Sequence, residues 1–216
     1  MVVNIKYKIK HYSPSLFYFL KKVRTQFLDY YYYYMWLLNN RPVPPPHSVK
    51  KKYIKDYSKR YQCTTLIETG THFGDMIHAN LNNFEHIISI ELDEKLYSNA
   101  VTKFKNNQHV KILHGDSSEL MGDIVSSIES NTLFWLDGHY SGPGTAMGDK
   151  STPIIAELEH LFNSHIKNKM VILIDDAREF NGNNDYPTID ELKNYVLSKN
   201  EQIDFVVSDD IIQFCL

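Results

Sequence analysis

Five short apolar runs, each ending in an acidic residue, constrain the fold of this 216-residue chain more than any other feature. The polar segments between the runs are each long enough for one helix, so the pattern predicts strands that alternate with helices. Strands joined in this way form a parallel sheet with helices on both faces. The runs are 65–68, 87–91, 111–116, 133–137 and 171–176.

The end of the chain predicts a different kind of connection. Two further apolar runs, 203–207 and 211–215, flank the turn residues Ser208, Asp209 and Asp210. This pattern is typical of a β-hairpin, which would add two strands and end the chain with an antiparallel one. The sequence therefore predicts an α/β fold with a mostly parallel, seven-stranded sheet.

The acids that end the five runs predict a functional edge of the sheet. In open sheets of this class, ligands bind just beyond the carboxyl ends of the strands. One acid at such an end is an ordinary exposed carboxylate, whereas acids at all five favour a binding site. They are Glu68, Glu91, Asp116, Asp137 and the adjacent Asp175 and Asp176.

The turn after the first run has the pattern Glu68-x-Gly70-x-x-x-Gly74. Glycine permits a tight turn and a close approach of the backbone to a ligand. The spacing differs from the Gly-x-Gly-x-x-Gly pattern of dinucleotide-binding domains. It resembles motif I of the class I S-adenosylmethionine (SAM)-dependent methyltransferases, which implies a Rossmann-like, doubly wound sheet.

The resemblance also implies how the cofactor would be held. The glycine turn would cradle the methionine part of SAM, and Glu68 would reach it directly or through water. Glu91 would hold the two ribose hydroxyls, because a carboxylate accepts several hydrogen bonds at once. Asp116 or its neighbour would contact the adenine amino group. The implied cofactor-binding residues are Glu68, Gly70, Thr71, Gly74, Glu91, Asp116 and Ser117.

The resemblance to the class I methyltransferases covers roughly 61–216. Four longer stretches resemble a bacterial group of class I methyltransferase-like proteins. Members of this group are often found among surface-polysaccharide biosynthesis proteins, which implies a glycan-related acceptor and a cytoplasmic enzyme. The stretches with this resemblance are Pro44–His47, Ile67–Thr71, Trp135–Gly142 and Ile172–Arg178.

The acids after the fourth and fifth runs predict a metal site. Strands four and five are expected beside the first strand, so their carboxylates would converge and repel unless a cation joins them. Oxygen ligands suit Mg²⁺ or Mn²⁺. The set Asp137, Asp175 and Asp176 resembles that of divalent-metal O-methyltransferases. The alternative is that Asp176 only caps the next helix.

A proton acceptor is expected just after the fourth run. His139 lies two residues beyond Asp137, and histidine as a residue type suits proton transfer near neutral pH, so we predict it as the catalytic base, with Tyr140 as the second choice. The alternative is an ordinary surface histidine. Some metal-dependent relatives place a lysine base here, but this chain has no lysine until Lys150.

The segment 141–153 is rich in glycine and proline, which predicts a loop that covers or lines the site. Lys150 and Thr152 in it, and Arg178 after the aspartate pair, would meet an anionic acceptor. The alternatives are a simple connector that leads into a helix near Pro153, and an Arg178 that pairs within the protein.

The first sixty residues differ from the rest in charge. They contain 13 basic and 2 acidic residues, a net charge of +11, whereas the remainder has 10 basic and 24 acidic residues, a net charge of −14. We predict a helical extension with a Pro-rich linker over 1–47 and a methyltransferase domain over 48–216. Three interpretations of the extension remain: a cover for the sheet or acceptor site, a peripheral contact of residues 1–40 with an anionic membrane, or a homodimer contact.

Other features exclude several classes. No apolar run approaches the roughly 20 residues that span a bilayer, and no secretory signal is recognisable. Cys63 and Cys215 have no zinc or redox spacing, which favours a reducing compartment. The basic extension lacks a nucleic-acid-binding motif, so no nucleic-acid partner is expected.

Taken as a whole, the sequence predicts a metal-assisted, SAM-dependent O-methyltransferase that modifies a hydroxyl or phosphoryl oxygen of a sugar or glycan. Two alternatives remain. The first is a metal-free methyltransferase with His139 as its base, and the second is a non-catalytic binding module of the same fold in glycan assembly.

Overall fold

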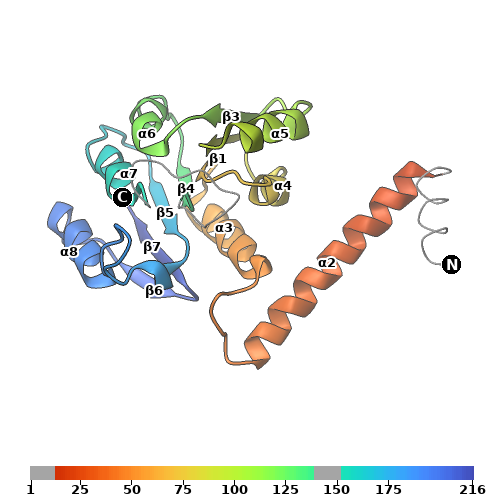
Figure 1. Ribbon diagram of the computed structural model, residues 1–216, viewed down its shortest axis with the longest axis horizontal. Helices are drawn as coiled ribbons and strands as arrows, with labels where there is room; N and C mark the ends of the chain where they lie inside the picture. The colour runs from red at the N-terminus through yellow and green to blue at the C-terminus, as the bar shows by residue number, and fades with distance from the viewer. Residues whose placement is uncertain (1–12, 139–151) are drawn as a thin grey trace. The chain divides into compact units, whose positions relative to one another are not determined.

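A computed structural model describes residues 13–138 and 152–216 of the chain. The chain divides into two compact units, up to residue 50 and from residue 51 to residue 216. The second unit contains one seven-stranded sheet in the order β3-β2-β1-β4-β5-β7-β6 (Figure 1). Its strands are β1 Thr65–Thr69, β2 His86–Glu91, β3 Val110–His114, β4 Thr132–Leu136, β5 Met170–Ile174, β6 Val206–Ser208 and β7 Ile211–Cys215.

The pairing of the strands confirms the predicted sheet. Strands β1 to β5 pair in parallel, and β7 runs antiparallel to both β5 and β6. In the register of the sheet, Thr69 lies opposite Ile90 and Leu136, and Leu136 lies opposite Ile174. The strands therefore end level with one another, and the residues that follow them meet at one edge.

Helices cover both faces of the sheet, as the alternation of elements predicts. The first group is α3 His47–Tyr61, α4 Asp75–Asn80 and α5 Glu94–Phe104. The second group is α6 Ser117–Ser126, α7 Ile154–Phe162 and α8 Ile189–Lys199.

Alternating residues of the buried strands build the two layers of the core. In β4, Leu133 and Trp135 belong to a cluster with Ile54, Ile77 and other residues of the first group of helices. Their neighbours in the strand, such as Phe134, pack against the second group. Side chains alternate between the faces of a strand, so a continuous apolar run is what a sheet covered on both faces requires.

Local signals place several helix ends. Thr188 begins α8 as part of a capping box, in which its side chain accepts from the Glu191 amide and the Glu191 carboxylate accepts from the Thr188 amide. Pro153 precedes α7, as the sequence predicts. Cys63 and Cys215 are free cysteines.

The first unit is dominated by helix α2, which runs from Pro14 to Leu38. At its end the chain turns back, and the Trp36 indole donates to the Pro42 carbonyl at 2.8 Å. The loop that follows leads into α3, which starts at His47. Within the described residues, no helix has both the length and the apolar character that crossing a membrane requires.

Candidate functional site

The turn after β1 is held tightly against the end of β4. Gly70 has a φ of +83°, and a Cβ there would lie 2.5 Å from the backbone carbonyl oxygen of Asp137. The Thr69 hydroxyl accepts hydrogen bonds from the backbone amides of Asp137 and Gly138 at 3.2 and 3.1 Å. Only glycine tolerates both the positive φ and the close approach of the Asp137 carbonyl oxygen at position 70. The first glycine of the motif therefore allows the turn after β1 to pack against the end of β4.

Glu68 lies beneath this turn and is almost fully buried. Its Oε2 accepts from the Ser89 hydroxyl at 2.5 Å, and Ser89 in turn contacts the Thr71 hydroxyl at 2.6 Å. Burial raises the pKa of Glu68 to about 8, although the hydrogen bond from Ser89 partly offsets the shift. A cationic ligand beside this group would favour its charged form.

Glu91 ends β2 and points back to the same turn. Its Oε2 accepts from the His72 amide at 2.7 Å, and its Oε1 accepts from the Asp93 amide at 3.0 Å. His72 has a φ of 49°, so the turn is bent into the left-handed region to present this amide. Each oxygen of Glu91 retains capacity for one more hydrogen bond, which suits a diol.

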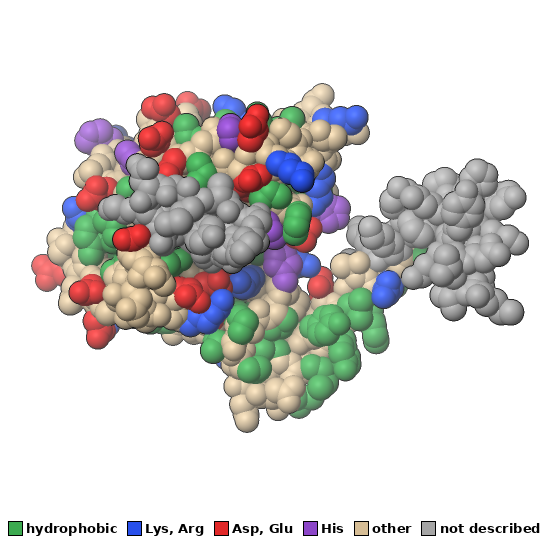
Figure 2. All heavy atoms as spheres, in the orientation of Figure 1, with side chains coloured by type: hydrophobic (Ala, Val, Ile, Leu, Met, Phe, Trp, Pro, Cys, Tyr) green, Lys and Arg blue, Asp and Glu red, His purple; other side chains and the backbone are tan. Residues whose placement is uncertain are grey.

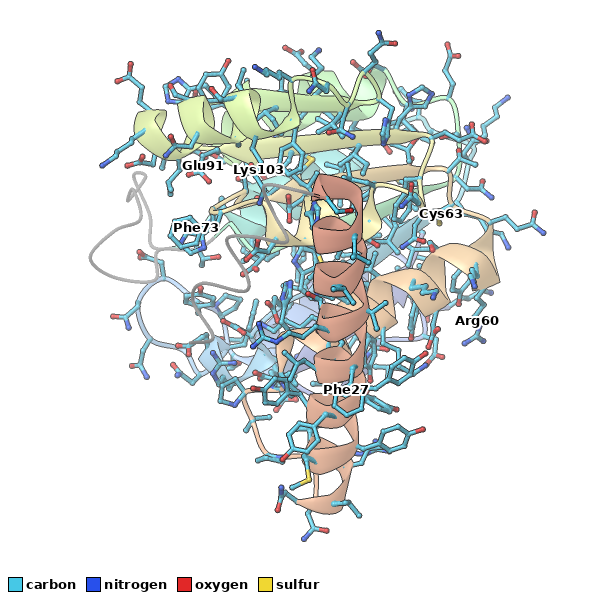
Figure 3. All side chains as sticks on the ribbon, turned by 90° about the vertical axis from the view of Figure 1, so that its right-hand side faces the viewer. Phe27, Arg60, Cys63, Phe73, Glu91 and Lys103 are labelled. Atoms are coloured by element: carbon cyan, nitrogen blue, oxygen red, sulfur yellow. The ribbon has the colours of Figure 1, made fainter. Side chains whose placement is uncertain are left out.

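A lysine outside the predicted set also holds the turn. The Lys103 ammonium, from α5, donates to the Phe73 carbonyl at 2.5 Å and lies near the Gly74 carbonyl (Figure 3). The Phe73 side chain is 62% exposed. The turn therefore presents an exposed aromatic ring, and the Lys103 ammonium offsets the partial negative charge of two of its backbone carbonyls.

Asp116 and Ser117 begin α6 at the end of β3. Asp116 is the N-cap residue, and its Oδ1 accepts from the amide and the hydroxyl of Ser118 at 2.8 and 2.6 Å. The Ser117 hydroxyl donates inward to the Glu157 carboxylate at 2.5 Å. Asp116 keeps Oδ2 for a ligand amino group, whereas the hydroxyl of Ser117 is directed into the protein.

The three acids predicted to bind a metal do converge at the ends of β4 and β5. One carboxylate oxygen from each of Asp137, Asp175 and Asp176 lies within 4.8 Å of the other two. Asp175 and Asp176 are buried, and Asp137 is partly exposed. Asp176 has a φ of 55° and makes no side-chain cap to the short helix that follows, so the capping alternative is not realised. Carboxylates this close repel one another in the absence of a positive charge.

Part of that positive charge comes from Arg178. Its guanidinium donates to Asp176 at 2.9 Å and to the buried Asp210, from the turn before β7. The Arg178 amide also donates to Asp210 at 2.8 Å. Arg178 therefore pairs within the protein, which is the alternative to its predicted contact with an anionic acceptor.

A shallow depression, partly open to solvent, lies beside these acids; we call it the pocket. It is lined by the ends of β4 and β5, the start of α7 and the loop after β5. Its polar or aromatic lining residues are Asp137, Thr152, Glu157, Asp175, Phe180 and Tyr186. Of these, Phe180 and Tyr186 pack edge to face with ring centroids 5.1 Å apart.

Glu157, on α7, is the main residue of this region that the sequence analysis missed. It is 1% exposed and accepts hydrogen bonds from Ser117 and Thr69. Burial raises the pKa of Glu157 to about 7, and the nearby Asp116 adds to the shift. The signal was present, because Glu157 lies on the apolar face of α7 together with Ile154 and other buried residues.

Some predicted residues lie outside the described part of the chain. His139 and Tyr140, the two predicted proton acceptors, belong to this group, as does Lys150. Thr152 is described and lines the pocket. The roles predicted for the cofactor and metal residues above stay predictions, although the structure places them at one edge of the sheet.

No protein-family model and no curated protein matches the sequence of the chain. Solved structures do match. The O-methyltransferase from Bacillus cereus, in complex with S-adenosylhomocysteine (SAH), has a TM-score of 0.55 at 12% identity and covers 83% of this chain and 85% of its own.

Two more structures show the same similarity. The O-methyltransferase TomG from Streptomyces achromogenes, involved in tomaymycin synthesis and solved with SAM, has a TM-score of 0.53 at 12% identity and 81% coverage of both chains. The methyltransferase domain of bacterial CtHen1 has a TM-score of 0.53 at 11% identity, covering 77% of this chain and 96% of its own. The chain therefore has the fold of the class I SAM-dependent methyltransferases.

Proposed function

We propose that this protein is a SAM-dependent O-methyltransferase that acts on a sugar or another polar, glycan-related acceptor. One observation supports the proposal most strongly. Acids from β1, β2, β4 and β5 meet at a single edge of the sheet, beside a glycine turn that only glycine can form. Two of the similar structures were solved with SAM or SAH bound, which supports the same ligand here.

The cofactor would lie over the ends of β1, β2 and β3. Glu91 would accept hydrogen bonds from the ribose hydroxyls through the capacity left by its two backbone contacts. Asp116 would accept from the adenine amino group. Glu68 lies below the turn, where its charge would offset that of the methionine ammonium or the sulfonium. In these roles the protein supplies orientation, which is a large part of the catalysis of group transfer.

Asp137, Asp175 and Asp176 fit a small divalent ion such as Mg²⁺ or Mn²⁺. Their donor set is all oxygen, two of the three groups are buried, and their oxygens converge within 4.8 Å. When bound, such an ion would supply Lewis-acid activation of an acceptor hydroxyl. Arg178 pairs with one acid of this set, Asp176, and also with Asp210 outside it.

The acceptor would occupy the pocket beside Asp137 and Asp175. The pocket combines carboxylates and a threonine hydroxyl with the aromatic pair of Phe180 and Tyr186, a mixture that suits a hydroxylated ring. His139 remains our proposed proton acceptor, with Tyr140 as the second choice. Both follow directly after Asp137 and Gly138 in the chain.

Thermal stabilisation tests the proposal and separates it from its alternatives. Ligands that bind the folded state raise the melting temperature by mass action. We expect SAH to stabilise the chain and Mn²⁺ or Mg²⁺ to enlarge the effect relative to a chelator. Asp175→Asn should remove the metal effect, whereas the exposed loop variant Asp185→Asn should keep it.

Each alternative has its own outcome in this experiment. Stabilisation by SAH that no metal enlarges would select the metal-free methyltransferase. The absence of stabilisation by SAH under every condition would contradict the proposal and select the binding module.

A further inference from the structure

Helix α2 presents a continuous apolar stripe along one face. Its apolar residues recur at alternating intervals of four and three, and in a helix of 3.6 residues per turn this spacing places them on the same side. The side chains of the stripe are between 45% and 69% exposed. Figure 2 shows apolar side chains gathered over the C-terminal half of the helix. The stripe consists of Leu16, Leu20, Val23, Phe27, Tyr30 and Tyr34.

The chain's own linker covers a different face of α2. Trp36 is 5% exposed, and its indole nitrogen donates to the Pro42 carbonyl. The Arg41 guanidinium lies over the Trp36 ring, 5.7 Å from its centroid. Two residues after Tyr34, Trp36 lies about 200° further around the helix, nearly opposite the stripe. The stripe therefore remains exposed beside the linker, and the Phe27 ring projects from the helix in Figure 3.

The described part of the second unit has no apolar surface that matches the stripe. Among its described residues, the large hydrophobic side chains that are exposed are Phe73, Val101, Val206 and Val207. They lie on the turn after β1, on α5 and on β6, so they do not form one patch as long as the stripe. An apolar face of several side chains on a helix marks a binding surface for something outside the chain.

Charge distinguishes between two candidates for binding the stripe, a second copy of the chain and an anionic membrane. Residues 1–60 have a net charge of +11, so two copies of this segment would repel one another when brought together. An anionic lipid surface would instead attract each nearby basic residue by about 1 kcal/mol. Tyrosine and tryptophan prefer the boundary between lipid and water, because the ring is apolar and its polar group stays hydrated. Tyr30 and Tyr34 place two such residues on the stripe.

We propose that α2 binds the surface of an anionic membrane and lies in its plane, with the stripe from Leu16 to Tyr34 turned toward the lipid. A basic, aromatic helix with a long exposed apolar stripe is the kind of segment that binds membranes in this way. The inference is independent of methyl transfer, because it rests only on α2 and the charge of the first sixty residues.

Vesicle binding by the full chain tests this inference. We would compare vesicles of phosphatidylcholine with vesicles that contain about one third phosphatidylglycerol, at low and high salt. The stripe variant is Phe27→Ser with Tyr34→Ser. The matched control lies off the stripe and is Tyr32→Ser with Met35→Ser, which are also exposed and lie about 160° and 100° around the helix from Tyr34. Circular dichroism and the melting temperature would show that both variants fold.

We expect binding to the anionic vesicles only, weakened by salt and by about tenfold or more in the stripe variant, with a smaller loss in the control. Two outcomes would overturn the inference. One is an absence of binding to anionic vesicles, or binding that the stripe variant retains. The other is a stripe-dependent dimer in light scattering without vesicle binding, which would identify a second copy as the occupant.

Discussion

Glu157 provides a prediction whose sign and size follow from its burial. The residue is 1% exposed, and burial raises its pKa from 4.5 to about 7. In the unfolded chain the same carboxyl ionises near its ordinary pKa. Between these two pKa values the folded state therefore holds a proton that the unfolded state has lost, and stability falls as the pH rises.

The magnitude follows from the difference between the two pKa values. A difference of about 2.5 pKa units corresponds to about 3 kcal/mol, because each unit is worth about 1.36 kcal/mol. Below a pH of about 4.5 both states are protonated, and this cost is absent. Above a pH of about 7 the cost is complete, since the folded protein must then bury a charged carboxylate.

Glu157→Gln removes the charge while its amide oxygen can still accept from Ser117. At about pH 8.5 the variant should be more stable than the parent by up to about 3 kcal/mol, or roughly 6–12 °C in melting temperature for a domain of this size. At about pH 5 the difference should be much smaller. The control is Glu159→Gln, an exposed carboxylate on the same helix, for which we expect no comparable dependence on pH.

The assay is thermal unfolding of the three proteins across this pH range with a chelator present, so that bound metal does not contribute. Glu68, whose pKa is also raised, adds the same pH dependence to each protein and cancels in the differences. A melting-temperature difference between Glu157→Gln and the parent that stays constant with pH would refute the reasoning. So would a parent that becomes the more stable protein at alkaline pH.

Three further substitutions test individual contacts. Gly70→Ala should lower the free energy of unfolding by about 2 kcal/mol or more and weaken SAH binding, because it adds a backbone clash to a strained φ. The control is Gly182→Ala, which has a φ of +84° but no backbone clash, and chemical denaturation should show a smaller loss of stability for it. Lys103→Met should weaken SAH binding severalfold in calorimetry while the fold persists, because it frees the Phe73 carbonyl. Thr188→Ala should lower stability by about 1 kcal/mol and leave SAH binding unchanged, since it removes only a helix cap.

The fold was predictable because its signals are local. Each buried strand is a continuous apolar run, and each polar segment between two runs is long enough for a helix. The acids that end the runs indicate the edge of the sheet where a ligand would bind, because parallel strands place their carboxyl ends together. The convergence of Asp137 with Asp175 and Asp176 follows from strand order, which the alternation of elements largely determines.

The internal partners of the site were not predictable in the same way. Ser117 donates to Glu157 across 40 residues of sequence, and Arg178 pairs with Asp210 across 32. Such contacts depend on how α6, α7 and the last turn pack, which no local pattern specifies. An acid on the apolar face of α7 was the one available sign, and it indicates burial without naming the partner.

The residues that line the pocket were also not predictable from the sequence. Phe180 and Tyr186 lie in the irregular segment after β5, and the path of that segment brings them to the pocket. In the sequence they are two aromatic residues in a polar loop, with no periodicity that would assign them to a face. Loop paths depend on tertiary contacts, so the residues that would select an acceptor are the ones that a sequence pattern describes least.

Calorimetric titration of SAH into the purified chain tests the central claim most directly. The account predicts one binding site per chain, weakened about tenfold or more in Glu91→Gln, because the amide would lose acceptor capacity toward the ribose. Glu94→Gln, an exposed residue at the start of α5, should bind as the parent does. The absence of SAH binding by the folded parent, or equal binding by the parent and Glu91→Gln, would contradict the account.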